Sequence, residues 1–470
     1  ETGDKSLALR AAHALDAQQK LPQDARLLLI GESLSRGDWR GARLLLDKLE
    51  EAGGFDFLIP SLRIWADLAA RDADASTSAA QQPRDGLGST YLREQQPLIL
   101  LARKQVDDGL TAAKALTRPD GRGLILRLAV AARLVALKER AKALELLVGD
   151  NSTMQAARAI VESGKPLPGA IDSPTDGTAF LIARIASDLL RDTGSSASLT
   201  FARIASFAAP DNDAIRMTLA QALANNGRTD EALTVLDGVA PLYGALLRDI
   251  RIGALLRADR NQEALTLAQE AVNHADADLY DHARLGGVLI KLQKPREAAA
   301  AYRESVRLAG GNAPWNLLLL YGGALDQAGQ WTEAKPVLQS AVAAAPDEPD
   351  ALNHLGYAML EHGDDLAEAT RLIAKASALR PDSAAITDSL GWAFYLRGQP
   401  DDSIPLLERA VAADPTEAAV GEHLGDAYWA AGRRVDARYA WRAALVQSEG
   451  AEDIKRIEDK IANGLPARAQ

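Results

Sequence analysis

The sequence contains no cysteine among its 470 residues. It therefore lacks a disulfide framework, a zinc finger, a thiol nucleophile, a cysteine-ligated iron–sulfur cluster and an acylated lipobox cysteine. Aromatic residues are also scarce, at 5% of the chain, so a core has to be built from alanine, leucine, valine and isoleucine. Because small side chains let helices cross closely, this composition favours packed helices over a thick sheet sandwich.

Long apolar runs and an excess of positive charge are missing too. No apolar run approaches the roughly 20 residues needed to span a bilayer. The 53 Lys and Arg residues face 64 Asp and Glu residues, for a net charge of −11, which argues against a protein that binds nucleic-acid phosphates. The chain begins Glu1-Thr2-Gly3 without a methionine, and we interpret these residues as a cloning remnant or a processed end.

A period of about 34 residues organises the rest of the chain. Leu355, Leu390 and Leu424 each begin a Leu-Gly-x-Ala-x block, and these leucines are 35 and 34 residues apart. A glycine-containing turn follows each block, and a second segment of helical periodicity follows the turn. Small residues recur in the same phase further upstream. They lie at Ser198, Ala232, Ala264, Ala298 and Ala334, and more irregularly at Ala42, Ala75, Gly109 and Ala143.

This pattern resembles the tetratricopeptide repeat, in which a W-x2-L-G-x2-Y helix is followed by a second helix and a closing proline. Pro346, Pro381 and Pro415 close three of the units here. The resemblance implies an all-α fold, a right-handed superhelical solenoid of about twelve helical hairpins with capping helices. Each hairpin would bury its apolar stripe only against its neighbours, so the core would grow by stacking.

The repeat phase divides the chain into segments. The last one is expected to hold a capping helix, because Ile454, Ile457 and Ile461 share one helical face. The segments are 1–22, an N-terminal helix; 23–150, degenerate repeats with a mobile loop at 72–89; 151–178, a helix and a Pro- and Gly-rich insertion; 179–451, the regular array; and 452–470, the capping helix and tail.

No group of residues predicts catalysis. The histidines lack the spacing of a metal site, and the Gly164-Lys165 pair lacks the rest of a P-loop. Acidic pairs such as Asp364-Asp365 precede second helices, where N-capping explains them. A basic run over 118–142, which includes Arg122, is explained by a solvated helix face. We therefore expect a non-enzymatic protein without metal or cofactor, and we rank an enzyme or a nucleic-acid binder well below an interaction protein.

The resemblance also suggests where a partner would bind. Tetratricopeptide arrays line a concave groove with residues of their first helices and bind extended peptides or partner helices there. Carboxylates beside aromatic rings would suit a protein or peptide with basic and apolar residues. The alternative is that the aromatic residues only fill gaps between repeats. The candidate partner-binding residues are Asn353, Tyr357, Glu361, Asp388, Trp392, Tyr395, Glu422, Asp426 and Trp429.

Charge is concentrated in the same region, since residues 350–449 contain 16 acidic and 9 basic residues. Residues 180–465 further resemble long bacterial tetratricopeptide proteins, some of which are envelope lipoproteins. For those members the resemblance implies docking of a carboxyl-terminal processing protease and delivery of substrates to it. The prediction is an interaction scaffold or adaptor, in the periplasm or envelope rather than the cytoplasm. The alternative is a regulatory or substrate-delivery subunit of an envelope enzyme such as a protease.

Overall fold

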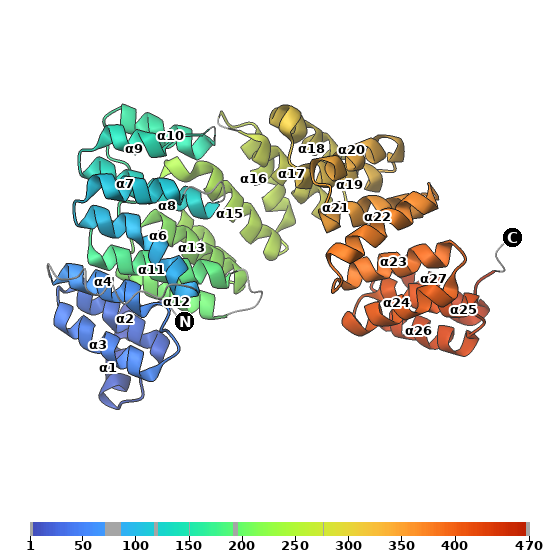
Figure 1. Cartoon of the computed structure of the whole chain (residues 1–470), viewed down its shortest axis with the longest axis horizontal. Coiled ribbons are helices and arrows are strands. Elements are labelled where there is room, and N and C mark those ends of the chain that lie inside the picture. Colours follow the sequence, from blue (N-terminus) through green and yellow to red (C-terminus); the bar gives the residue numbers. More distant parts are fainter. Residues whose placement is uncertain are drawn as a thin grey trace. The chain divides into compact units, whose positions relative to one another are not determined.

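The computed structural model describes residues 3–70, 86–116, 121–149, 151–190, 196–275 and 277–466. All regular elements within these ranges are helices, and most of them pair as antiparallel hairpins (Figure 1). This confirms the prediction of an all-α fold built from helical repeats. The chain divides into two compact units, Glu1–Ala277 and Asp278–Gln470, which we call the first and the second unit. No helix in the described ranges has both the length and the apolar character needed to cross a membrane.

The first unit contains the less regular repeats. Residues 72–85 of the expected loop lie outside the described residues, whereas residues 87–89 are not loop but the start of α6. The helix expected in the segment 151–178 is α10. The helices of this unit are α1 (Lys5–Ala17), α2 (Gln23–Ser35), α3 (Trp39–Ala52), α4 (Ile59–Ala69), α6 (Leu87–Ala102), α7 (Val106–Ala115), α8 (Gly121–Ala136), α9 (Arg140–Leu146), α10 (Ser152–Glu162), α11 (Pro174–Leu189), α12 (Ser196–Ala208), α13 (Asp213–Asn225), α14 (Thr229–Leu236), η2 (Pro241–Tyr243), α15 (Gly244–Arg257) and α16 (Asn261–Val272).

Helices far apart in sequence meet inside this unit, which simple stacking of neighbouring repeats does not predict. The α2 helix packs against α11 and α12, and α4 packs against α11 (Figure 1). The fully buried Trp65 of α4 lies against Gly177 of α11, where a Cβ atom would fall 2.3 Å from the indole ring. Phe55 and Phe201 meet edge to face with ring centroids 5.8 Å apart. The expectation that each hairpin contacts only its neighbours is therefore wrong for the first unit.

The second unit follows the repeat pattern more closely. Its first helices carry the Leu-Gly blocks, and at Gly391 a Cβ atom would lie 2.7 Å from Leu407 of the paired helix. The glycine therefore lets the two helices cross closely, as the sequence predicts. The helices are α17 (Leu279–Lys291), α18 (Pro295–Ala309), η3 (Gly310–Asn312), α19 (Trp315–Gln327), α20 (Trp331–Ala344), α21 (Pro349–Glu361), α22 (Leu366–Leu379), α23 (Ala384–Leu396), α24 (Pro400–Ala413), α25 (Ala418–Ala430), α26 (Arg434–Gln447) and α27 (Ala451–Asn463).

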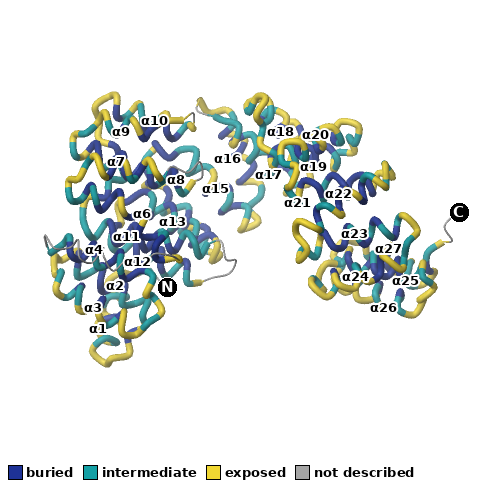
Figure 2. Tube along the Cα trace, viewed as in Figure 1, coloured by how far each residue is buried: buried dark blue, intermediate teal, exposed yellow. Residues whose placement is uncertain are grey.

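The core of the second unit ends at α27. Ile457 is 1% exposed and packs with Ala437, Trp441 and Ala444, so it covers apolar surface that α26 would otherwise expose. Figure 2 shows buried positions along the inner sides of the helices and exposed positions at the turns. The Asp365 carboxylate caps α22 by accepting hydrogen bonds from the amides of Ala367 and Glu368, as expected for an acidic residue before a second helix.

Candidate functional site

A groove of about 620 Å³ lies along the first helices of successive hairpins in the second unit. It is lined by residues of α19, α21, α23 and α25 and of the turn before α25. Four of the nine predicted residues come together in it: Asn353, Tyr357, Glu361 and Asp388. Asn353, Tyr357 and Glu361 share one face of α21 because they are four residues apart, and Asp388 comes from α23 of the next repeat.

The lining of this groove, which we call the acidic groove, is strongly negative. Six carboxylates line it, and within the described part of the chain its lining includes no lysine or arginine. Burial lowers the pKa of His354, although Asp326 opposes the shift, so this ring is neutral at pH 7 and does not offset the charge. The six are Asp326, Asp350, Glu361, Asp388, Asp414 and Glu417.

Cations at the rim compensate part of this charge. Asp326 lies 2.6 Å from His362, Asp350 lies 2.5 Å from Arg380, and Asp388 accepts from Nδ1 of His423 at 3.0 Å. Two of these three partners are histidines, which carry a charge only when protonated. The acidic groove therefore keeps a net negative charge near neutral pH.

Two uncharged groups add hydrogen-bonding capacity. The pKa of Tyr357 is raised, by burial first and then by the charge of Glu361, so its hydroxyl remains a donor at any physiological pH. The Oδ1 atom of Asn353 is buried and has no hydrogen-bond partner among the described residues. A buried acceptor of this kind costs stability unless a donor satisfies it. A ligand that brings an N–H or ammonium group would supply that donor.

Trp392 supports the acidic groove from one end without being part of its lining. Its Nε1 donates to Glu361 at 3.1 Å, and its ring stacks on His423 and Tyr395 with centroids 4.1 and 4.7 Å away. Tyr395 is only 6% exposed and packs with core residues such as Leu407. The expectation that Tyr395 faces a partner is not met, because this ring fills the gap between two repeats.

Glu422 and Asp426 also differ from the expectation, because α27 covers them. Arg456 donates to both carboxylate oxygens of Glu422 at 2.9 and 2.8 Å, and Lys460 bonds both acidic residues at 2.6 and 2.7 Å. Burial would raise the pKa of Glu422, but these hydrogen bonds outweigh it and lower the pKa to about 2. For Asp426 burial dominates over Lys460, and the pKa is raised. Both carboxylates hold the capping helix in place, and neither lines the acidic groove.

Trp429 packs in the C-terminal part of the second unit, near α26 and α27. Its ring lies 5.5 Å from that of Trp441, and the guanidinium groups of Arg434 and Arg438 lie 4.9 and 5.1 Å from its centre. Gly464, just beyond α27, also approaches this ring closely. Trp429 therefore packs under the C-terminal segment and does not line the acidic groove.

Sequence reasoning missed several residues of the acidic groove, above all Asp350, His354 and Glu417. Asp350 lies at the start of a first helix, three residues before Asn353, so the repeat phase contained the signal for it. Glu417 comes from the turn before α25, where the repeat pattern carries no information about side-chain direction. In the described residues, no three His, Asp or Glu side chains are grouped as metal ligands would be.

Comparisons with known proteins agree with the fold. Tetratricopeptide repeat family models match residues 315–358, 355–418 and 389–452 of this chain. The TPR repeat-containing protein PA4667 of Pseudomonas aeruginosa is 29% identical over 199 residues, which cover 41% of this chain and 28% of the relative. The matched part thus spans less than a third of that relative's length.

Solved tetratricopeptide structures are similar over part of the chain. TTC0263 of Thermus thermophilus is 19% identical with a TM-score of 0.35, and covers 39% of this chain and 99% of its own. MamA of Desulfovibrio magneticus RS-1 is 21% identical with a TM-score of 0.32, and covers 36% of this chain and 94% of its own.

Proposed function

We propose that this chain is a non-catalytic interaction scaffold that binds a protein or peptide partner in the acidic groove of the second unit. The observation that carries the proposal is the lining of six carboxylates without a lysine or arginine, beside the phenol of Tyr357. The partner segment would carry Lys or Arg side chains for the carboxylates and apolar side chains for Leu319 and Val420, which also line the acidic groove.

The physical properties of such binding follow from the exposure of the groove. Charge pairs at a solvent-accessible rim contribute about 0.2–1 kcal/mol each and are screened by salt. Affinity therefore has to come from several charge pairs together with apolar contacts. We expect a partner of moderate affinity whose binding weakens as ionic strength rises.

A titration with two matched peptides tests the proposal. The probe is a fluorescein-labelled 12-residue peptide containing two lysines and two leucines, and the control peptide has glutamates in place of the lysines. Fluorescence anisotropy with the full chain should show binding of the lysine peptide only. Equal binding of both peptides, or of neither, would refute the proposal.

Matched variants separate the groove from the net charge of the chain. The double variant Glu361→Gln with Glu417→Gln removes two carboxylates from the acidic groove. Its affinity for the lysine peptide should be about five- to tenfold lower. Asp382→Asn with Glu452→Gln removes two exposed carboxylates elsewhere in the second unit and should leave binding unchanged. Equal weakening in both double variants would show that only overall charge matters.

The cellular setting that we propose is the bacterial periplasm or envelope, where the chain would deliver substrates to a partner enzyme such as a protease. This part rests on the resemblance of residues 180–465 to long bacterial tetratricopeptide proteins. Fractionation of source cells, followed by crosslinking and mass spectrometry, tests it. Recovery of the chain from the cytoplasm alone would contradict the proposed location. It would not affect the proposal of peptide binding, which the peptide titration tests.

A further inference from the structure

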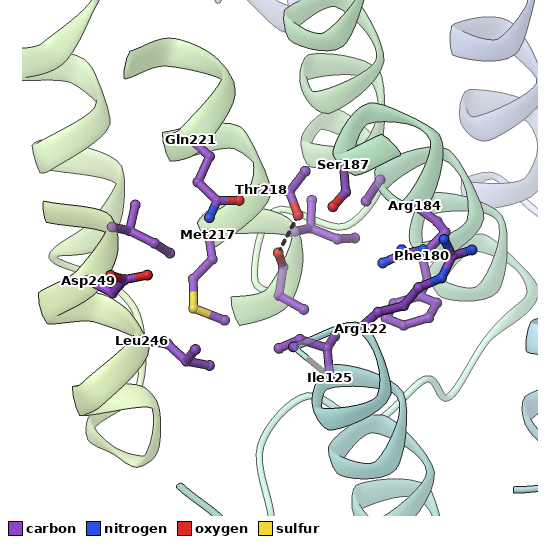
Figure 3. A pocket seen from close by; sticks show the side chains of 15 residues that line it. Arg122, Ile125, Phe180, Arg184, Ser187, Met217, Thr218, Gln221, Leu246 and Asp249 are labelled. Carbon is purple, nitrogen blue, oxygen red and sulfur yellow. Dashed lines mark hydrogen bonds between the residues drawn. The ribbon is translucent and has the colours of Figure 1, made fainter. Parts of the chain in front are cut away.

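The first unit contains a pocket that the proposed function does not use. The pocket measures about 270 Å³ and lies between α8, α11, α13 and α15 (Figure 3). A cavity of about 150 Å³ lined by apolar side chains is large enough to bind benzene. This pocket can therefore hold one large apolar side chain. Its apolar walls are formed by Ile125, Phe180, Met217, Leu246 and Ile250.

Two arginines lie at one end of this pocket, opposite Gln221 and Asp249 (Figure 3). They are Arg122 and Arg184, whose side chains are 13% and 12% exposed. The sequence around Arg122 predicts a solvated basic helix face. In the structure, however, the guanidinium group of Arg122 is nearly buried. Buried charges are costly unless they are paired, so their partners decide what these arginines can do.

Carboxylates outside the pocket lining hold both guanidinium groups in position. Arg122 donates to both oxygens of Glu94 and, at 3.1 Å, to Asp188, which also accepts from Arg184 at 3.2 Å. The hydroxyl of Tyr91 donates to Asp188 at 2.8 Å and fixes that carboxylate in turn. The arginines are therefore already ordered, and a ligand that binds them does not have to immobilise flexible side chains.

Arg184 is the less well compensated of the two. In the described part of the chain, the Nε atom of Arg184 lies 3.5 Å from a Glu94 oxygen without a hydrogen bond, and the guanidinium group hydrogen-bonds one carboxylate, that of Asp188. Burial lowers the pKa of Arg184, and the positive charge of Arg122 lowers it further. An additional carboxylate near this guanidinium would stabilise its charged form.

The space continues beyond the pocket. A second hollow of about 350 Å³ shares Ser187, Gln221, Asp249 and Ile250 with it and adds Arg257. Together the two hollows present three arginines and one aspartate. The guanidinium groups offer hydrogen-bond donors here, although Glu94 and Asp188 compensate the charge of two of them, whereas the acidic groove offers carboxylate acceptors. The two sites therefore select partners of different chemistry.

We propose that the pocket is a second binding site, specific for a peptide in which a large apolar side chain neighbours a carboxylate. The apolar side chain would enter between Phe180 and Met217, and the carboxylate would bind Arg184. The carboxylate can come from an Asp or Glu side chain or from the C-terminus of a chain. Both sources offer the planar acceptor pair that guanidinium groups bind.

Isothermal titration calorimetry of the full chain with three unlabelled, N-acetylated peptides tests the site and its two sources. The first peptide is Gly-Ser-Gly-Phe with a free C-terminal carboxylate, the second is its C-terminal amide, and the third is the amide Gly-Phe-Glu-Gly. We expect the first or the third peptide to bind at least about tenfold more tightly than the second. Whichever of the two binds identifies the source, and equal affinity of all three, or no binding, would overturn the proposal.

Variants of the pocket complete the test. Arg184→Gln should lower the affinity for the preferred peptide by about tenfold. Arg251→Gln is the matched control, because Arg251 pairs with Asp237 outside the pocket and should leave binding unchanged. Ser187→Leu fills the shared part of the two hollows without altering charge and should abolish binding. Unchanged affinity in Ser187→Leu, with an unchanged circular dichroism melting curve, would overturn the proposal.

Discussion

Replacing Lys460 by alanine should loosen the C-terminal helix from the second unit. The Nζ atom of Lys460 lies 2.6 Å from Glu422 and 2.7 Å from Asp426, and the side chain is 15% exposed. Without it Glu422 keeps Arg456, but Asp426 loses its only ion-pair partner in the described structure while it stays 4% exposed. An uncompensated buried carboxylate of this kind is costly.

The magnitude follows from the burial of the pair. Removing one partner of a buried ion pair costs about 3–5 kcal/mol. The remaining exposure of Lys460 lets water reach the site, so we expect the lower end, about 3 kcal/mol. That corresponds to roughly a hundredfold increase in the opening equilibrium of α27. Apolar contacts of Ile457 remain, so the loss should stay local to this end of the second unit.

Hydrogen–deuterium exchange with mass spectrometry measures this opening directly. Amides of α27 should exchange about a hundredfold faster in Lys460→Ala, while amides of α21 keep their wild-type rates. The control is Lys455→Ala, an exposed change on the same helix that should alter exchange little. Wild-type exchange in Lys460→Ala, or equal acceleration in both variants, would refute the electrostatic account of the cap.

Two further predictions concern acid sensitivity and close packing. The folded pKa of Glu422 is lowered to about 2, so its contribution is complete above pH 4.5 and is lost as the pH falls toward 2. The protection of α27 amides, measured relative to their intrinsic exchange rates, should fall in that window, and Glu422→Gln should abolish most of this pH dependence. Gly177→Ala places a methyl group 2.3 Å from Trp65, so thermal unfolding should show the first unit destabilised by about 1–3 kcal/mol or more. An unchanged transition in Gly177→Ala would contradict the packing argument.

The regular part of the fold could be predicted because its cause is local. A glycine such as Gly391 is required wherever paired helices cross closely, so the 34-residue period reports the hairpins of the second unit directly. The contact of Trp65 with Gly177 joins helices more than 100 residues apart, and no periodicity encodes which distant faces meet. The closing of the first unit on itself was therefore not predictable from the repeats.

The candidate site shows the same division. Asn353, Tyr357 and Glu361 share one face of α21 because helical spacing determines it, and the repeat period brings Asp388 of α23 to the same groove. The burial of Glu422 depends on α27. Arg456 lies one repeat period after Glu422 and pairs with it, so the repeat phase contained a signal for this contact.

Arg122 illustrates a limit of reading charge from sequence. A run of basic residues is usually a solvated helix face, and the sequence around Arg122 fits that description. Its burial depends on Glu94 and Asp188, which lie 28 and 66 residues away along the chain. Such ion pairs are determined by tertiary packing, so the pocket at Arg184 became visible only in the structure.

Site-specific photo-crosslinking tests the central claim, that the acidic groove binds the partner, most directly. A benzoylphenylalanine at Ala385, an exposed residue that lines the acidic groove, should capture the lysine and leucine peptide described above. The same group at Ala412, exposed on α24 and absent from that lining, should capture none. Capture at Ala385 alone is the predicted result. Capture at Ala412 with equal yield, or no capture at Ala385 under conditions where the peptide binds, would contradict the account.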